Sequence, residues 1–200
     1  MILHTVGDSH SLFVWENISL PWLQVVTHHV GPRTMFRFGQ DKLALADIQK
    51  FGVKNGEAVV FCWGEIDCRA HVYLHREEGV KAVLNRIADS YFTAIRENVS
   101  RYQRLTVGVF NVVPPRRYVK GKRARDMVFE GTDEERQQYV LRMNVALRAR
   151  CVKAGYLFVD VYDSYCDEEG FLRMELSDKR THIIAPQPME EFLTRRLKER

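Results

Sequence analysis

The residues with the clearest chemical potential lie in the segment 6–11, which reads Val-Gly-Asp-Ser-His-Ser. This segment follows a short β-rich run at 2–6, and Gly7 lets the backbone turn sharply where that run ends. In α/β proteins, ligands bind beyond the carboxyl ends of the strands. The placement therefore predicts that Ser9 is a nucleophile. The alternative is that Asp8 and Ser9 cap a following helix, because both residue types accept hydrogen bonds from free helix N–H groups.

Strands and helices alternate along the chain that must position Ser9. The hydrophobic patterns predict strands at 2–6, 23–30, 57–63, 105–113 and 156–162. They predict helices at 10–15, 41–51, 79–101 and 132–153, and a closing helix marked by apolar residues from 189 to 197. Such alternation favours a mostly parallel sheet with helices on both faces. Residues at or near the expected strand ends on one side are Ser9, Gly31, Asp67 and Asn111.

The bulk properties favour a single domain spanning residues 1–200. The chain is 46% hydrophobic and 28% charged, which is ordinary for a globular protein with one core. The first expected strand starts at residue 2, which leaves no room for a secretory signal, and no apolar run approaches the roughly 20 residues that a bilayer requires. We therefore expect a cytoplasmic protein without a membrane partner.

The cysteines and histidines give little indication of a disulfide framework or a metal site. Four cysteines are present without a CxxC pair, namely Cys62, Cys68, Cys151 and Cys166, so we expect reduced thiols. His71 and His75 have a spacing that could hold a metal on a helix, but no third ligand lies nearby. A solvated helix face is the better interpretation of this pair.

A long basic loop is expected at 114–131, between the fourth strand and the next helix. The first half of this loop contains six basic residues and no acid, namely Arg116, Arg117, Lys120, Lys122, Arg123 and Arg125. Three interpretations remain open: a solvated loop, a rim that attracts anionic substrates, or a nucleic-acid surface. We rank nucleic acid last, because Tyr118 is the only aromatic residue interleaved with these charges.

The motifs, taken in order, resemble those of the SGNH (GDSL-like) hydrolases. The resemblance rests on Gly-Asp-Ser at 7–9, Gly31, the segment 64–67 and the segment 178–182, and it covers nearly the whole chain. The GDSHS and GEIDCR forms look most like a branch of uncharacterised or glycan-associated members. The resemblance implies a three-layer, flavodoxin-like α/β fold with a mostly parallel five-stranded sheet, and esterase or acyl-transfer chemistry without a cofactor.

The same resemblance implies a role for each matching residue. Ser9 would attack an acyl carbonyl, while its own N–H and that of Gly31 would bind the oxyanion. His182 would take the Ser9 proton and pass it to the leaving alcohol. Asp178 is the nearest candidate for the acid that orients His182.

Two departures from the family pattern bear on these roles. The third block normally reads GxND, and here Ile66 stands where the asparagine amide would bind the oxyanion. Losing one such donor costs about 10²–10³ in rate, unless a residue such as Arg69, Arg33 or His10 substitutes.

The second departure is one of spacing, because the family places Asp three residues before the histidine and here Asp178 is four before it. Asp160 or Asp163 could serve instead, or His182 could work with Ser9 as a dyad.

The resulting expectation is a serine esterase or acyltransferase acting on an O-acyl ester, an O-acetyl group on a carbohydrate being the first choice. The alternative is a hydrolytically inactive module or transferase that binds a glycan or nucleotide in the same crevice. Asp67 and Arg69 are expected to form an ion pair at the crevice. The candidate substrate-binding residues are Asp8, His10, Arg33, Gly64, Glu65, Asp67, Arg69 and Asn111.

Overall fold

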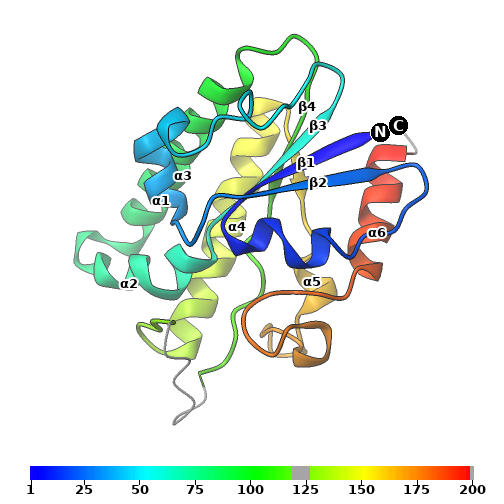
Figure 1. The fold of residues 1–200 in the computed structure, drawn as a ribbon. Coiled ribbons are helices and arrows are strands. Elements are labelled where there is room, and N and C mark those ends of the chain that lie inside the picture. The colour runs from blue at the N-terminus through cyan, green and yellow to red at the C-terminus, as the bar shows by residue number, and fades with distance from the viewer. Residues whose placement is uncertain (119–126, 199–200) are drawn as a thin grey trace.

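A five-stranded parallel sheet forms the centre of the computed structural model, which describes residues 1–118 and 127–198 (Figure 1). The strand order is β2-β1-β3-β4-β5, and each neighbouring pair is parallel. The strands are β1 (Ile2–Gly7), β2 (Gln24–His29), β3 (Ala58–Cys62), β4 (Thr106–Phe110) and β5 (Leu157–Val159). The expected α/β class and parallel sheet are confirmed.

Helices cover both faces of the sheet. They are α1 (Met35–Asp41), α2 (Val72–Leu74), α3 (Val80–Val99), α4 (Asp133–Ala154), α5 (Tyr162–Tyr165) and α6 (Gln187–Leu193). Shorter turns include η1 (Ser9–Ser11), η2 (Phe13–Trp15) and η4 (Asp67–His71). Among the described residues, no helix combines the length and apolarity needed to cross a membrane.

Two hydrophobic cores lie on opposite faces of the sheet, because successive strand side chains point to opposite sides. On β3, Val59 and Phe61 pack with α1, α3 and α4, whereas Val60 and Cys62 pack with η2 and α6. Every residue of β3 is buried, as its continuous apolar sequence predicts for a central parallel strand. The result is a three-layer arrangement that holds β1 and β3 rigidly side by side.

The predicted helix at 41–51 is wrong. The helix in this region is α1, which ends at Asp41, and a 3-10 turn and further turns follow it. Thr34 caps α1 by accepting a hydrogen bond from the Arg37 N–H, and Lys42 ends it with φ +49°. The apolar residues after 44 pack into the core from a turn whose Ile48 N–H donates to Asn98.

Other element bounds differ less. The segment 10–15 forms the two turns η1 and η2 instead of one helix, and β4 and β5 are shorter than expected. The predicted start and end of α4 are confirmed: Thr132 and Glu135 form a capping box, and Gly155 follows the helix in the left-handed conformation. All four cysteines are free, as expected.

Replacing Gly7 by alanine should strongly destabilise the fold. A Cβ atom at this position would lie 2.0 Å from the carbonyl oxygen of Cys62 on the adjacent strand, and a backbone oxygen inside a sheet cannot move aside. We expect Gly7→Ala to lower the free energy of unfolding in urea by about 3 kcal/mol or more. Gly108→Ala is the matched control, because its Cβ would chiefly meet valine methyl groups at 3.0 and 3.5 Å. Equal losses for the two variants would contradict this account.

Candidate active site

Ser9 lies where β1 ends, at the first residue of η1, and its side chain is only partly buried. The Asp8 side chain caps η1 by accepting a hydrogen bond from the His10 N–H at 2.8 Å. The helix-cap interpretation of this segment therefore holds for Asp8, and the cap fixes the turn that presents Ser9. The Oγ atom of Ser9 lies 2.8 Å from Nε2 of His182, across 173 residues of sequence.

Asp178 completes a chain of hydrogen bonds with these two residues. Its Oδ2 atom lies 2.6 Å from Nδ1 of His182, and its Oδ1 atom accepts the N–H groups of Arg180 and His182 at 2.8 and 3.1 Å. The intervening turn places Lys179 at φ +64°, and the Asp178 N–H donates back to the His182 carbonyl. A spacing of four residues is therefore accommodated by a closed turn. The alternative acid Asp160 pairs with Arg148 instead.

Burial and the charge of His10 favour the neutral form of His182 at pH 7. Burial lowers the pKa of His182, and the charge of the neighbouring His10 lowers it further, against opposing effects of Asp178 and Glu65. Burial alone would raise the pKa of Asp178, but hydrogen bonds from the His182 ring and from backbone N–H groups hold that pKa below its usual value. Because ionised Asp178 only accepts hydrogen bonds, Nδ1 of His182 carries the proton and Nε2 is free to accept the Ser9 proton.

His10 is a buried cation that joins the Ser9 turn to the His182 loop. Its Nδ1 atom lies 2.9 Å from Oδ1 of Asp8, and its Nε2 atom lies 3.2 Å from the carbonyl oxygen of Thr181. Both partners are acceptors, so both ring nitrogens carry protons. Burial lowers the pKa of His10, but the Asp8 carboxylate and smaller effects of Glu65 and Thr181 raise it overall to about 9.

Phe13 also contacts the histidine. Its ring stacks on the His182 ring at 3.9 Å between centroids and 9° between planes. Phe13 adopts a φ of +34°, which is uncommon for a bulky residue and places the ring over the imidazole. Nothing in the sequence distinguished Phe13 from an ordinary core aromatic, so the sequence analysis did not identify it.

Gly31 follows β2 beside the Ser9 turn, because β2 pairs with β1. Its φ is +89°, and its N–H donates to no group among the described residues. The Ser9 N–H is at the first position of a 3-10 turn, where an N–H has no partner within the turn itself. Both N–H groups therefore lack a partner among the described residues and can donate to a ligand beside Ser9. Ile66 is in a helical segment after β3 and offers only an apolar side chain there.

The segment after β3 differs from the sequence expectation. Arg69 does not pair with Asp67; it pairs with Glu65, with 2.7 Å between Nε and Oε1. The helical backbone here brings residues four apart together and turns residues two apart away from each other. Asp67 instead caps α1, accepting the N–H groups of Met35 and Phe36 at 2.6 and 3.0 Å, and burial raises its pKa to about 7. Gly64 adopts φ +124° against Val112, where a Cβ would clash.

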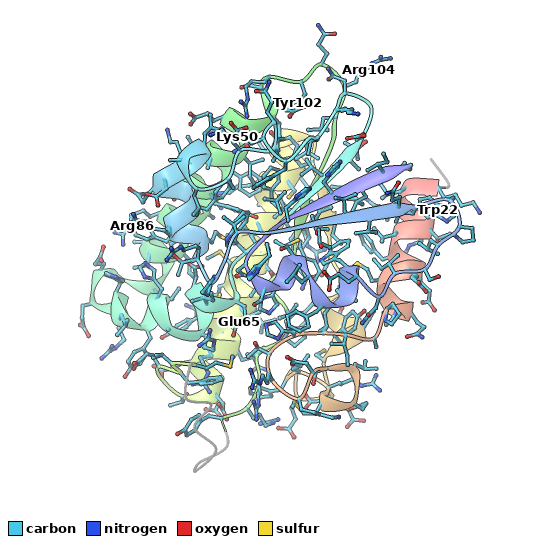
Figure 2. All side chains as sticks on the ribbon, viewed as in Figure 1. Trp22, Lys50, Glu65, Arg86, Tyr102 and Arg104 are labelled. Atoms are coloured by element: carbon cyan, nitrogen blue, oxygen red, sulfur yellow. The ribbon has the colours of Figure 1, made fainter. Side chains whose placement is uncertain are left out.

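The other candidate substrate-binding residues are placed as follows. Asn111 is buried and its side-chain amide bonds to backbone, donating to the Val112 carbonyl and accepting from the Val161 N–H. Asp8 and His10 bind each other, as described above. Arg33 is exposed, two residues beyond Gly31. Figure 2 shows Glu65 at the carboxyl end of the sheet, opposite to Tyr102 and Arg104 at the amino end.

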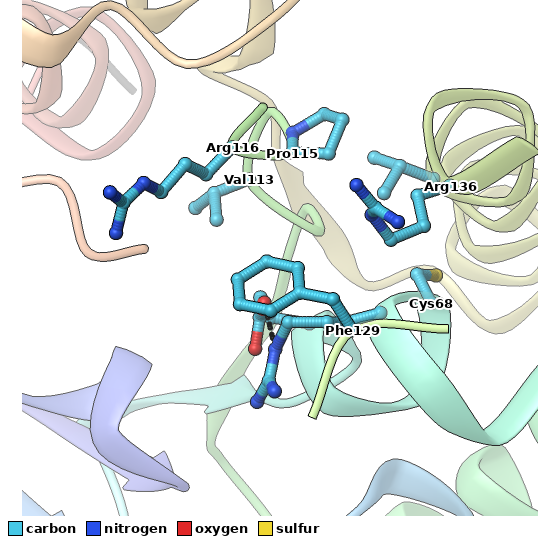
Figure 3. A pocket seen from close by; sticks show the side chains of 9 residues that line it. Cys68, Val113, Pro115, Arg116, Phe129 and Arg136 are labelled. Carbon is cyan, nitrogen blue, oxygen red and sulfur yellow. Dashed lines mark hydrogen bonds and ion pairs between the residues drawn. The ribbon is translucent and has the colours of Figure 1, made fainter. Parts of the chain in front are cut away.

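A pocket opens beside Glu65, between the segments that follow β3 and β4 and the start of α4 (Figure 3). Its walls are Glu65, Cys68, Arg69, Val113, Pro115, Arg116, Phe129, Arg136 and Val140. Of the predicted basic loop 114–131, residues 119–126 lie outside the described residues, among them Lys120, Lys122, Arg123 and Arg125. Within the described part of the chain, no group of three or more His, Cys, Asp or Glu residues could hold a metal ion.

Solved structures of other proteins share this arrangement of elements. An acetylxylan esterase from Geobacillus stearothermophilus matches with a TM-score of 0.60 and 11% identity, covering 97% of this chain and 92% of that one. A GDSL-like lipase from Bacteroides thetaiotaomicron matches with a TM-score of 0.57 and 12% identity, covering 99% of this chain and 88% of that one. A protein from Slackia heliotrinireducens assigned to the SGNH hydrolases matches with a TM-score of 0.56 and 15% identity, covering 96% of this chain and 98% of that one. The chain has the SGNH hydrolase fold. No protein-family model and no curated protein sequence matches it.

The SGNH hydrolase fold explains why residues so far apart in sequence meet. The loops after β1 and β2 and the loop before α6 all lie at the carboxyl edge of the sheet, where the crevice of an open parallel sheet forms. These three loops bring Ser9, Gly31 and His182 to that edge.

The charged state of His10 should be visible in the pH dependence of stability. The pKa of His10 is about 9 in the folded protein against 6.5 when exposed. Its contribution to the free energy of unfolding is therefore complete below pH 6.5 and is lost as the pH rises through 9. The size of this contribution is roughly 3 kcal/mol. We expect His10→Asn to lower the free energy of unfolding in urea much more at pH 6 than at pH 9.5. His29→Asn, at an exposed histidine of β2, is the control. A loss that does not change with pH would contradict a charged His10.

Proposed function

We propose that this protein is a member of the SGNH family and acts as a serine esterase or acyltransferase on an O-acyl ester, with an O-acetyl group as the simplest substrate. The observation that supports the proposal best is the unbroken chain of hydrogen bonds from Ser9 Oγ through His182 to Asp178, at 2.8 and 2.6 Å. A serine hydroxyl is a weak nucleophile by itself, and an adjacent neutral histidine held by a carboxylate is the arrangement that activates it.

The geometry suggests the following course of reaction. Ser9 Oγ attacks the acyl carbonyl while its proton passes to Nε2 of His182, and the Ser9 and Gly31 N–H groups stabilise the negative oxygen. Asp178 stabilises the imidazolium that forms. The imidazolium then protonates the leaving alcohol, and a water molecule or an acceptor hydroxyl, deprotonated by His182, releases the acyl group from Ser9.

A carbohydrate ester is the substrate we favour. The fold is shared with an acetylxylan esterase, for which a catalytic mutant carrying alanine in place of a serine has also been solved. The identity to that enzyme is only 10–11%, so this choice rests on the likeness of fold and on the motifs that resemble glycan-associated members.

A second candidate function follows from Ile66. With Ile66 in place of the asparagine amide, the oxyanion has two backbone donors, and this loss favours slow turnover or a module that binds its ligand without hydrolysing it. Covalent labelling separates the two functions, because a fluorophosphonate reacts only with an activated serine.

Ser9→Ala should abolish ester hydrolysis and fluorophosphonate labelling together, because both need the Oγ atom that contacts His182. Release of acetate or of a chromogenic alcohol from a simple acetate ester measures the first, and fluorescence of the labelled band measures the second. Ser11→Ala is the control, because the Ser11 hydroxyl donates to backbone carbonyls and does not contact His182. Undiminished turnover in Ser9→Ala would remove Ser9 from the mechanism, and a wild-type protein that is never labelled would favour the binding module.

The pH profile of hydrolysis should show an acid limb below pH 6.5. His182 must be neutral to accept the Ser9 proton, and its pKa is lowered, so kcat/KM rises with pH through that lowered value and is near its maximum at pH 7. His10→Asn removes a positive charge that faces His182, so its acid limb should move to higher pH. An acid limb above 6.5 in the wild type, or one that His10→Asn leaves in place, would contradict this electrostatic assignment.

A further inference from the structure

The pocket beside Glu65 contains more positive than negative charge. Three guanidinium groups line it, from Arg69, Arg116 and Arg136, and Glu65 supplies the one carboxylate. Glu65 is already paired with Arg69 at 2.7 Å. The ring of Phe129 lies 5.3 Å from the guanidinium carbons of both Arg69 and Arg136, so it forms an apolar wall between the two charges. Figure 3 shows Arg116 and Arg136 on opposite sides of this ring.

Arg136, which lines this pocket, has one N–H without a hydrogen-bond partner among the described residues. Its side chain is 3% exposed; it pairs with Asp133 and donates to the Gly131 carbonyl at 2.8 Å. Its Nε atom is buried and has no partner among the described residues. Burial lowers the pKa of Arg136, and the nearby Arg69 charge acts in the same direction. A buried guanidinium with a free N–H is therefore incompletely compensated by the protein itself.

Arg116 is a second uncompensated charge. Within residues 1–118 and 127–198, its guanidinium has no ion pair and no side-chain hydrogen bond. The adjacent Arg117 differs: it pairs with Glu169 at 2.6 Å and lies over the Phe171 ring. Two neighbouring arginines in one segment therefore have different roles, and only Arg116 lines the pocket.

The pocket is next to the Ser9 site. Glu65 follows β3, which pairs with β1, the strand that ends at Ser9. The carboxylate of Glu65 is close enough to contribute to the electrostatics of both His10 and His182. The pocket and Ser9 therefore lie at the same edge of the sheet, and a substrate that follows this edge from Ser9 would approach Arg116.

We propose that Arg116, half-buried at the edge of the pocket that Arg69 and Arg136 also line, binds an anionic group of the ester substrate, a carboxylate or a phosphate. Guanidinium groups match the geometry of both anions, and charge-assisted hydrogen bonds in a partly buried site are strong. This inference rests on the proposed esterase function and narrows its substrate class to esters that carry a negative charge in the acyl or the alcohol part.

Matched esters test the proposal in steady-state kinetics. The neutral reference is phenyl acetate, and the anionic probes are 4-acetoxybenzoate, 4-acetoxyphenyl phosphate and monophenyl succinate, which place a carboxylate or phosphate on the alcohol side or a carboxylate on the acyl side. We expect at least one anionic ester to exceed phenyl acetate in kcat/KM by about tenfold or more at low salt. The probe that gains most identifies the anion and the side that carries it. No gain for any anionic probe, with phenyl acetate hydrolysed by Ser9, would overturn the inference and leave the esterase function standing.

Variants locate the effect in the pocket. Arg116→Gln should bring the anionic-to-neutral ratio of kcat/KM close to one, and Arg116→Lys, which keeps the charge but loses the planar guanidinium, should lower the ratio in part. Arg117→Gln is the matched control and should leave the ratio as in the wild type. An anion preference that is unchanged in Arg116→Gln, or lost equally in Arg117→Gln, would overturn the assignment to this pocket.

A binding measurement keeps the inference separate from catalysis. Calorimetry on Ser9→Ala with 4-hydroxybenzoate, phenyl phosphate and succinate reports anion binding even if the wild type hydrolyses no ester. Binding that weakens about tenfold or more in the Ser9→Ala, Arg116→Gln double variant supports the pocket as an anion site. Absence of binding for all three anions overturns it.

Discussion

The hydrogen bond between Ser9 and His182 is the constraint to which the rest of the site is fitted. It joins a turn after the first strand to a loop that follows all five strands, so neither side chain can be placed by local structure alone. The sheet brings the turn and the loop close to each other, because parallel strands have their carboxyl ends at one edge. The final adjustment comes from His10, whose ring bonds to Asp8 on one side and to the Thr181 carbonyl on the other. The turn and the loop are therefore tied together next to the bond that would do the chemistry.

Buried charge serves two different purposes at this edge of the sheet. Asp67 accepts two N–H groups at the start of α1 and so has a structural task, as does the Glu65–Arg69 pair in holding the segment after β3. Around His182, by contrast, burial and the charge of His10 lower the pKa of the imidazole against the opposing effects of Asp178 and Glu65, so the ring stays neutral at pH 7. Charges that lie only a few residues apart in sequence thus act on different parts of the molecule.

The sequence was sufficient for the features that depend on local patterns. Three features were predictable because a local physical cause produces each of them: the buried strand β3 from its apolar run, the start of α4 from the capping box at Thr132, and its end from Gly155. The helix expected at 41–51 is wrong because the apolar residues there, Ile48 among them, reach the core from turns. The helix of this region is α1, whose start is fixed by Thr34 together with Asp67 from a distant segment.

The site was predictable only where a motif carried it. Ser9, Gly31, Asp178 and His182 were all named from the sequence, and the structure brings Ser9, His182 and Asp178 into hydrogen-bonding contact. The stacking of Phe13 and the contact of His10 with Thr181 depend on backbone torsions and on loops that meet only in the folded chain. No spacing in the sequence encodes them.

The distance in sequence between Ser9 and His182 also has a consequence for protein synthesis. A nascent chain that has been extended through β5 already contains every strand of the sheet and the exposed turn at Ser9, but not the base that would activate the hydroxyl. The contact between Ser9 and His182 can therefore form only after the last loops have been synthesised and have docked. If Ser9 is the nucleophile, its activation requires completion of the fold.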